Sequence, residues 1–167
     1  MKFGKLQPPI HLLSYCDASY GNLPDGSSQG GYIIFLADER GSVSPICWSS
    51  RKLRRVCRST VAAETMAMLD AIDACIWLSH IISEVVDCDM GSIKVKTDDM
   101  SLYESVHSTT ANEEKHLRVE IASIRESIRN KEVEVEWVDN KIQLADVLTK
   151  QGADSTKLLT VLHNGRL

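Results

Sequence analysis

The sequence predicts an α/β fold in which a mixed five-stranded sheet, three antiparallel strands plus two parallel ones, is flanked by helices. Two observations predict it. Three apolar segments with short polar connections come first, and short connections join antiparallel strands. Helical and strand patterns then alternate, and strands that are linked through a helix enter a sheet in parallel. The 167 residues are enough for one domain of this kind.

Three strands are expected near the N-terminus, over residues 11–17, 31–36 and 43–50. Residues 21–31 are rich in Gly, Pro, Asp and Ser and form the predicted loop between the first two strands. Side chains alternate between the two faces of a strand, so Asp17 lies on the same face as Leu13 and Tyr15. Asp17 is therefore expected at the C-terminal end of the first strand.

A long helix is predicted over residues 59–86, with Ser59 or Thr60 as its N-cap. One stripe of this helix is apolar and contains Met68, Ala71, Cys75, Leu78 and Ile82. Glu64 is at the head of the stripe, so we expect its carboxylate to face the sheet. The alternative is a glutamate that is favoured there only by the helix dipole.

The second half of the domain alternates between strands and helices. Its predicted strands are residues 92–97 and 133–137, and its predicted helices are residues 99–107, 113–130 and 143–150. Asp98 closes the fourth strand, and Asp99 is the expected N-cap of the next helix. Parallel strands place Asp17 and Asp98 at one edge of the sheet, where open α/β sheets bind ligands.

We expect residues 1–10 to be a lead-in segment, residues 11–150 the domain, and residues 151–167 a C-terminal tail with a short helix near 155–162. The five cysteines form no CxxC pair, which favours free thiols over a zinc site or a disulfide framework. The sequence has no uninterrupted apolar run of about 18 residues and no secretory signal. We therefore expect no membrane segment and an intracellular location, in a cytoplasmic particle or the nucleus.

Four acidic residues are the strongest indication of chemistry: Asp17, Glu64, Asp98 and Asp146. Each follows or lies within an apolar stretch, where a carboxylate is costly unless it is paired or bound to metal. Gathered by the fold, they would form an all-oxygen site suited to Mg²⁺ or Mn²⁺. Two such ions are a standard apparatus for phosphodiester hydrolysis.

A basic block precedes Glu64 and contains Arg51, Lys52, Arg54, Arg55 and Arg58. The net charge of −4 does not by itself indicate a nucleic-acid-binding protein. The block could nevertheless hold phosphates through charge and bidentate guanidinium contacts. Its alternative interpretation is a solvated basic loop.

The order of elements and the acidic set resemble ribonuclease H. The words SYCDASY, GGYIIFL, WSSRKL, RSTVAAET, TDDMSL and QLADVLTK, in this order, resemble the ribonuclease H domain that ends the polyprotein of copia-type LTR retrotransposons. The resemblance covers about residues 11–150. It implies two Mg²⁺ ions, with Mn²⁺ as a substitute, and cleavage of the RNA strand of an RNA·DNA hybrid to 5′-phosphate and 3′-hydroxyl products.

The resemblance also implies a role for each acid. Asp17 would bridge both ions, Glu64 and Asp98 would complete the shell of one, and Asp146 would hold the other. Glu64 would also lie near the ribose 2′-hydroxyl. The expected partners are the hybrid and a reverse transcriptase domain of the same polyprotein.

The sequence departs from the family in one respect. Related enzymes often carry a histidine about nine residues before the last aspartate, where this chain has Trp137. Three functions stay open: an active ribonuclease H, a weak or inactive retroelement-derived domain that binds hybrid or duplex, and an integrase-like or resolvase-like two-metal nuclease.

Overall fold

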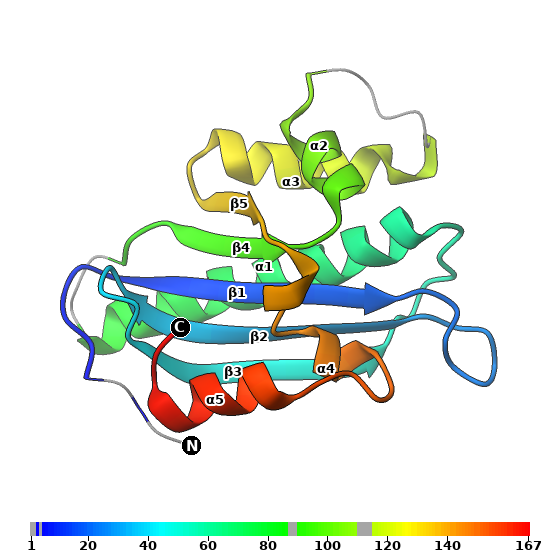
Figure 1. Ribbon diagram of the computed structural model, residues 1–167. Coiled ribbons are helices and arrows are strands. Elements are labelled where there is room, and N and C mark those ends of the chain that lie inside the picture. Colours follow the sequence, from blue (N-terminus) through cyan, green and yellow to red (C-terminus); the bar gives the residue numbers. More distant parts are fainter. Residues whose placement is uncertain (1–2, 4, 87–89, 110–114) are drawn as a thin grey trace.

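The computed structural model describes residues 3, 5–86, 90–109 and 115–167 (Figure 1). The strands are β1 (Ile10–Ser19), β2 (Gln29–Asp38), β3 (Val43–Lys52), β4 (Ile93–Thr97) and β5 (Val133–Trp137). The α-helices are α1 (Thr60–Val86), α2 (Met100–His107), α3 (Arg118–Arg129), α4 (Asp146–Thr149) and α5 (Thr156–Asn164). Two short 3₁₀ segments, η1 (Lys115–Leu117) and η2 (Asn140–Ile142), precede α3 and α4.

The five strands form one sheet in the order β3-β2-β1-β4-β5 (Figure 1). β1, β2 and β3 are antiparallel neighbours, whereas β4 pairs in parallel with both β1 and β5. The predicted mixed sheet, including the parallel entry of the last two strands, is confirmed. β4 lies beside β1 because the long helix α1 carries the chain back along the sheet before β4 begins.

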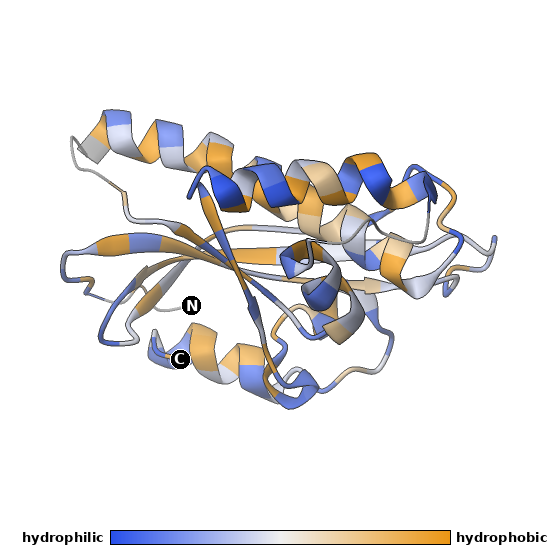
Figure 2. Ribbon diagram, turned by 90° about the horizontal axis from the view of Figure 1, so that it is seen from above, coloured by the Kyte–Doolittle hydropathy of each residue, from blue (hydrophilic) through white to orange (hydrophobic). Residues whose placement is uncertain are grey.

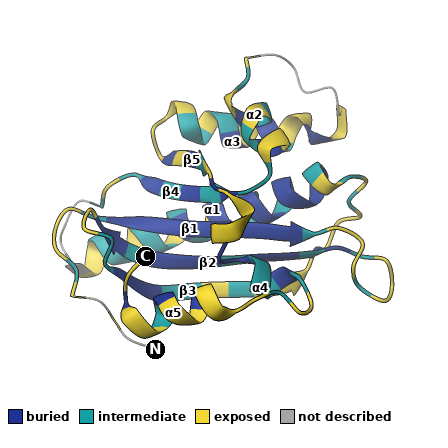
Figure 3. Cartoon of the chain, viewed as in Figure 1, coloured by how far each residue is buried: buried dark blue, intermediate teal, exposed yellow. Residues whose placement is uncertain are grey.

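Helices cover both faces of the sheet (Figure 2). The alternation along β1 separates two cores: Leu12 and Cys16 pack with α1, α2 and α3, whereas Leu13 and Tyr15 pack with α4 and α5. In Figure 1, α1 lies behind the sheet and α5 lies in front of it. The central strands are consequently buried along most of their length (Figure 3).

By length and composition alone, α1 is long and apolar enough to cross a membrane. This is weak evidence for a membrane span, because buried core helices also meet these two criteria. Its predicted apolar stripe instead packs on the sheet: Met68, Ala71 and Cys75 are fully buried. α1 is therefore the core helix of this domain. Ser59 is its N-cap, since the Ser59 hydroxyl accepts a hydrogen bond from the Ala62 N–H at 3.1 Å.

Several boundaries differ from those predicted. β1 continues past Asp17 and β2 begins before Gly31, because the antiparallel ladder continues through Ala18–Gly30 and Ser19–Gln29. Asp17 therefore lies within β1 rather than closing it. α3 begins at Arg118, after η1, and residues 113–114 of its predicted range lie outside the described residues.

The predicted last helix of the domain is also shorter than expected. Residues 143–145 precede α4, and Gln143 has an extended backbone with φ −69° and ψ 112°. The last segment of the chain, expected as a tail, carries α5, whose Leu158 and Val161 are buried in the core beside α4. Its end is also held by the Val43 N–H, which donates to the Gly165 carbonyl at 3.0 Å.

Four cysteines are free thiols, as predicted: Cys16, Cys47, Cys57 and Cys75. Cys88 lies outside the described residues.

Candidate active site

Three aspartates from distant parts of the sequence meet at one edge of the sheet. Asp17 comes from β1, Asp98 directly follows β4, and Asp146 is the first residue of α4. One carboxylate oxygen from each lies within 4.8 Å of the others. Asp17 is buried and the other two are partly exposed, so the cluster is open to solvent on one side.

Two features of the sheet bring this cluster together. The parallel pairing of β1 with β4 places Asp17 and Asp98 at the same edge. Asp17 pairs in register with Gly31 of β2, where α4 crosses. A Cβ atom on Gly31 would lie 2.8 Å from the Leu148 Cβ and 2.9 Å from the Thr149 Cγ2. The absence of a side chain at Gly31 therefore lets α4 pack directly on β2 and present Asp146.

Glu64 approaches the site from α1, which packs on the face of the sheet opposite to α4. Its place on the buried stripe of the helix predicts this orientation. Its side chain is buried, with 4% of the residue exposed. One oxygen, Oε1, accepts a hydrogen bond from the Ala18 N–H at 3.2 Å, whereas Oε2 is buried and has no hydrogen-bond partner among the described residues. Burial, followed by repulsion from Asp17 and Asp98, raises the pKa of Glu64 well above its usual value.

Asp17 is the most buried of the aspartates, with 1% exposed. Burial raises the pKa of Asp17 to about 6, although hydrogen bonding from Thr149 and the charge of Lys150 act in the opposite direction. The Thr149 hydroxyl donates to Oδ2, and the Lys150 ammonium lies 3.1 Å from Oδ1. Both oxygens of Asp17 are therefore engaged by residues at the C-terminal end of α4.

Sequence reasoning did not assign Gln143, Thr149 or Lys150 to the site. The Gln143 amide donates to the Cys16 carbonyl at 2.9 Å and to Oδ1 of Asp98 at 3.2 Å. Lys150 lies four residues after Asp146, and side chains at this spacing lie on the same side of a helix. This spacing was the one available signal for Lys150, and nothing in the sequence indicated Gln143.

Trp137 connects β5 to the site. Its indole N–H donates to the backbone carbonyl of Asp98 at 3.1 Å, and 42% of the residue is exposed. Trp137 thus contacts the backbone of a site aspartate.

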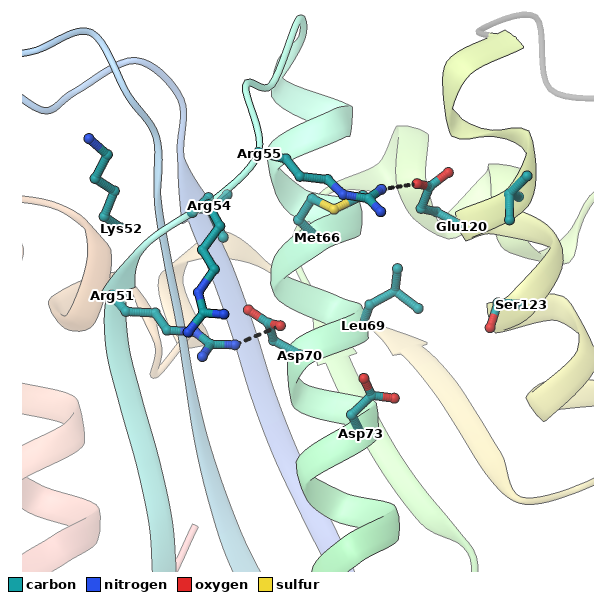
Figure 4. A pocket seen from close by; sticks show the side chains of 12 residues that line it. Arg51, Lys52, Arg54, Arg55, Met66, Leu69, Asp70, Asp73, Glu120 and Ser123 are labelled. Carbon is teal, nitrogen blue, oxygen red and sulfur yellow. Dashed lines mark hydrogen bonds and ion pairs between the residues drawn. The ribbon is translucent and has the colours of Figure 1, made fainter.

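The basic block begins at the same end of the sheet, because Arg51 pairs with Gly30, which pairs with Ala18. Four members of the block, Arg51, Lys52, Arg54 and Arg55, line a cleft of about 480 Å³ between β3, α1 and α3 (Figure 4). Ion pairs engage three of its members: Arg51 with Asp70 at 2.7 Å, Arg55 with Glu120 at 2.5 Å, and Lys52 with Asp25.

The other two members of the block differ from these three. Arg54 and Arg58 form no ion pair within the part of the chain that the structure describes. In Figure 4 the Arg54 side chain extends beside Arg51 towards Asp70. The five cations consequently do not form one uniform positive surface.

No family model matches this chain. The chain is 34% identical over 161 residues to the transposon Ty1-DR1 Gag-Pol polyprotein of Saccharomyces cerevisiae. The aligned region covers 92% of this chain and 9% of that protein. The Ty1-LR3 Gag-Pol polyprotein of the same yeast is also 34% identical, over 160 residues, with the same coverage. The chain thus spans about a tenth of the length of these relatives.

Solved structures show the same fold. The N-terminal RNase H domain of a Mycobacterium tuberculosis protein superposes with a TM-score of 0.64 at 15% identity, covering 90% of this chain and 99% of that domain. This chain has a ribonuclease H fold and is related to LTR retrotransposon polyproteins. LC11-RNase H1, solved in complex with an RNA/DNA hybrid, gives a TM-score of 0.61 at 16% identity, covering 87% of this chain and 98% of that protein.

The ribonuclease H fold also occurs within a larger enzyme. The prototype foamy virus protease–reverse transcriptase matches with a TM-score of 0.58 at 18% identity, covering 92% of this chain and 23% of that protein. In that protein the fold belongs to the same polypeptide as a reverse transcriptase.

Proposed function

We propose that this domain is a copia-type ribonuclease H, a two-metal endonuclease that hydrolyses the RNA strand of RNA·DNA hybrids during retrotransposon reverse transcription. The observation that carries the proposal is the meeting of Asp17, Asp98 and Asp146 within 4.8 Å, with the buried Glu64 beside them. The ribonuclease H fold and the related polyproteins support the same activity.

The donor set fits a hard divalent cation. All four side chains supply oxygen, the ligand that Mg²⁺ and Mn²⁺ prefer in proteins. Oε2 of Glu64 is buried and lacks a partner, which is costly for a carboxylate unless a cation or a hydrogen-bond donor is bound there. We propose that Asp17, Glu64, Asp98 and Asp146 hold two ions, Mg²⁺ or alternatively Mn²⁺.

The site residues would have separate roles in the proposed cleavage reaction. When bound, two divalent ions generate the attacking hydroxide and stabilise the leaving 3′-oxygen. Asp17 would help to hold both ions, and the Gln143 amide donates to the Asp98 carboxylate and so orients it. The unpartnered oxygen of Glu64 could also accept a hydrogen bond from a ribose 2′-hydroxyl, the group that distinguishes RNA from DNA.

The proposed partners follow from the same function. The basic block borders the carboxylates at one end of the sheet, and it would hold phosphates of the hybrid. LC11-RNase H1 has been solved with an RNA/DNA hybrid, and the foamy virus neighbour carries a reverse transcriptase, which supports both proposed partners.

A second candidate is a weak or inactive domain that binds hybrid without cutting it. The observation that favours it is Trp137, which is hydrogen-bonded to the Asp98 carbonyl where related enzymes often have histidine.

Cleavage of an end-labelled RNA·DNA hybrid, with and without Mg²⁺ or Mn²⁺, separates the two candidates. We expect cleavage of the RNA strand alone, dependent on metal, and reduced by at least about a hundredfold in Asp98→Asn. Asp99→Asn is the matched control, because Asp99 caps α2 through the Leu102 N–H and asparagine is an equally good cap.

The outcomes are distinct. Undiminished cleavage by Asp98→Asn would remove Asp98 from the site. A folded native protein that binds the hybrid but leaves it intact with either metal would favour the second candidate.

A further inference from the structure

The Lys150 ammonium lies inside the acidic cluster. Its Nζ is 2.6 Å from Oδ1 of Asp146 and 3.1 Å from Oδ1 of Asp17. Asp17 is almost fully buried, and the Lys150 side chain is 36% exposed. A positive charge therefore already joins two of the carboxylates to which the proposed function assigns metal ions.

This contact balances a repulsion that the fold creates. Carboxylates held a few ångströms apart in a partly buried site repel one another strongly, because water screens them poorly there. The ammonium offsets part of this repulsion for Asp17 and Asp146. The hydroxyl of Thr149 donates to the other oxygen of Asp17, so each oxygen of that carboxylate has a partner within the chain.

The ammonium and a divalent ion compete for these oxygens. Mg²⁺ binds carboxylate oxygen at about 2.1 Å, which would place it within a few ångströms of an ammonium that contacts the same atoms. Two cations at that separation repel each other. Metal binding through Oδ1 of Asp17 or Asp146 therefore favours movement of the ammonium away from these oxygens.

The structure allows that movement without a change in the backbone. The Lys150 N–H donates to the Asp146 carbonyl at 2.9 Å, which fixes the start of the side chain. The flexible four-carbon stem can then rotate the ammonium into solvent, where the partly exposed side chain already reaches.

We propose that Lys150 is a built-in counter-ion of the metal site: it holds Asp17 and Asp146 together in the metal-free domain and is displaced when a divalent ion binds. This inference rests on the proposed metal site but not on hybrid cleavage. Lys150 stabilises the empty site and, for the same reason, weakens the affinity of the site for metal.

Calorimetric titration with Mg²⁺ and Mn²⁺, together with thermal unfolding in EDTA, tests the proposal without any nucleic acid. Lys150→Met keeps the length of the side chain and removes its charge. We expect this variant to bind the ions about fivefold more tightly and to unfold at a lower temperature in EDTA, a deficit that saturating metal abolishes.

Two control variants separate the contact from general charge effects. Lys141 and Lys150 line the same cleft beside α4, so Lys141→Met removes a positive charge from the same neighbourhood. Lys141 is exposed, and its side chain has no ion pair within the described residues. Lys150→Arg keeps a charge at the contact. Both should bind metal with nearly the native affinity. If Lys150→Met folds only in the presence of metal, that result also supports the proposal.

Three results would overturn it. Unchanged or weaker metal binding by Lys150→Met would exclude competition between the ammonium and the ion. An unchanged unfolding temperature in EDTA would exclude the stabilising role. Absence of metal binding by every variant and by the native protein would overturn the metal site itself, whereas the first two results leave that site in place.

Discussion

The acidic cluster joins residues that are far apart in the sequence, whereas the basic block consists of residues that are close in the sequence but pair with different partners. The four acids are spread from Asp17 to Asp146, yet three of them meet within 4.8 Å. The five cations lie within residues 51–58, yet three of them form ion pairs with acids from different parts of the fold. Closeness in the sequence therefore does not by itself gather side chains into one cluster, whereas the parallel pairing of β1 with β4 and the packing of α4 on the sheet do.

The difference has a physical cause. A carboxylate at the end of a buried strand has its position fixed by the backbone of the sheet, so parallel strands gather such groups. An arginine in an exposed segment has a long flexible side chain and pairs with whichever carboxylate lies within reach. Asp70 of α1 and Glu120 of α3 are the acids in reach here.

The largest expected effect compares two glutamates. Glu64 and Glu120 each have a buried Oε2 without a hydrogen-bond partner. Glu64→Gln should lower metal-dependent hybrid cleavage by at least about a hundredfold, because a metal ligand is lost. Glu120→Gln should cleave like the native protein at saturating hybrid, because Glu120 lies outside the acidic cluster and pairs with Arg55 instead. Initial rates of cleavage measure both variants. Equal losses of activity in the two would show that Glu64 has no special role as a metal ligand.

The next effect concerns the pH dependence of stability in EDTA. Since the pKa of Asp17 is raised to about 6 from an unfolded value near 3.8, the folded state binds this proton more tightly. Stability from Asp17 is thus greatest at low pH and is lost as the pH rises from about 3.8 to about 6, by roughly 3 kcal/mol. Urea unfolding of native protein and Asp17→Asn should diverge as the pH rises.

The difference between these two proteins reports the titration of Asp17 together with the repulsion between Asp17 and Glu64. Burial and the charge of Lys94 lower the pKa of His11, which gives the opposite trend, but His11 is common to both proteins. Parallel stability profiles would mean that Asp17 titrates normally. Saturating Mg²⁺ should reverse the advantage of low pH, because metal binding requires the ionised carboxylate.

The smallest effect compares two arginines of the basic block. Arg54→Ala should reduce the slope of log affinity against log salt for hybrid binding by about one, because a phosphate contact is lost. Arg51→Ala should reduce it less, since Asp70 already neutralises Arg51. Fluorescence anisotropy in EDTA at several salt concentrations measures both. Unchanged slopes in both variants would favour the solvated loop.

Much of the scaffold could be predicted from local patterns. β5 has the predicted bounds, the apolar stripe of α1 is buried, and the Asp99 side chain caps α2. Each of these depends on residues that are close in the sequence, so periodicity and capping rules apply directly. The helical connections between strands predicted that β1 and β4 are parallel, and this pairing places Asp17 and Asp98 at the same end of the sheet.

The contacts inside the site could not be predicted in the same way. Lys150 contacts Asp146 at helical spacing, but its second contact, Asp17, lies 133 residues away. Gln143 was expected within a helix, whereas its side chain reaches Asp98 and its backbone is extended. Such contacts arise only when two layers of the fold meet, and no spacing within one segment encodes them.

Gly31 offers no functional group, yet it determines where α4 lies and so where Asp146 and Lys150 stand. In a retroelement copy that drifts without selection, activity could be lost by any substitution that adds a side chain at this position. All four acids would still be present in the sequence of such a copy. Counting intact acidic residues would then overestimate how many genomic copies still encode a working enzyme.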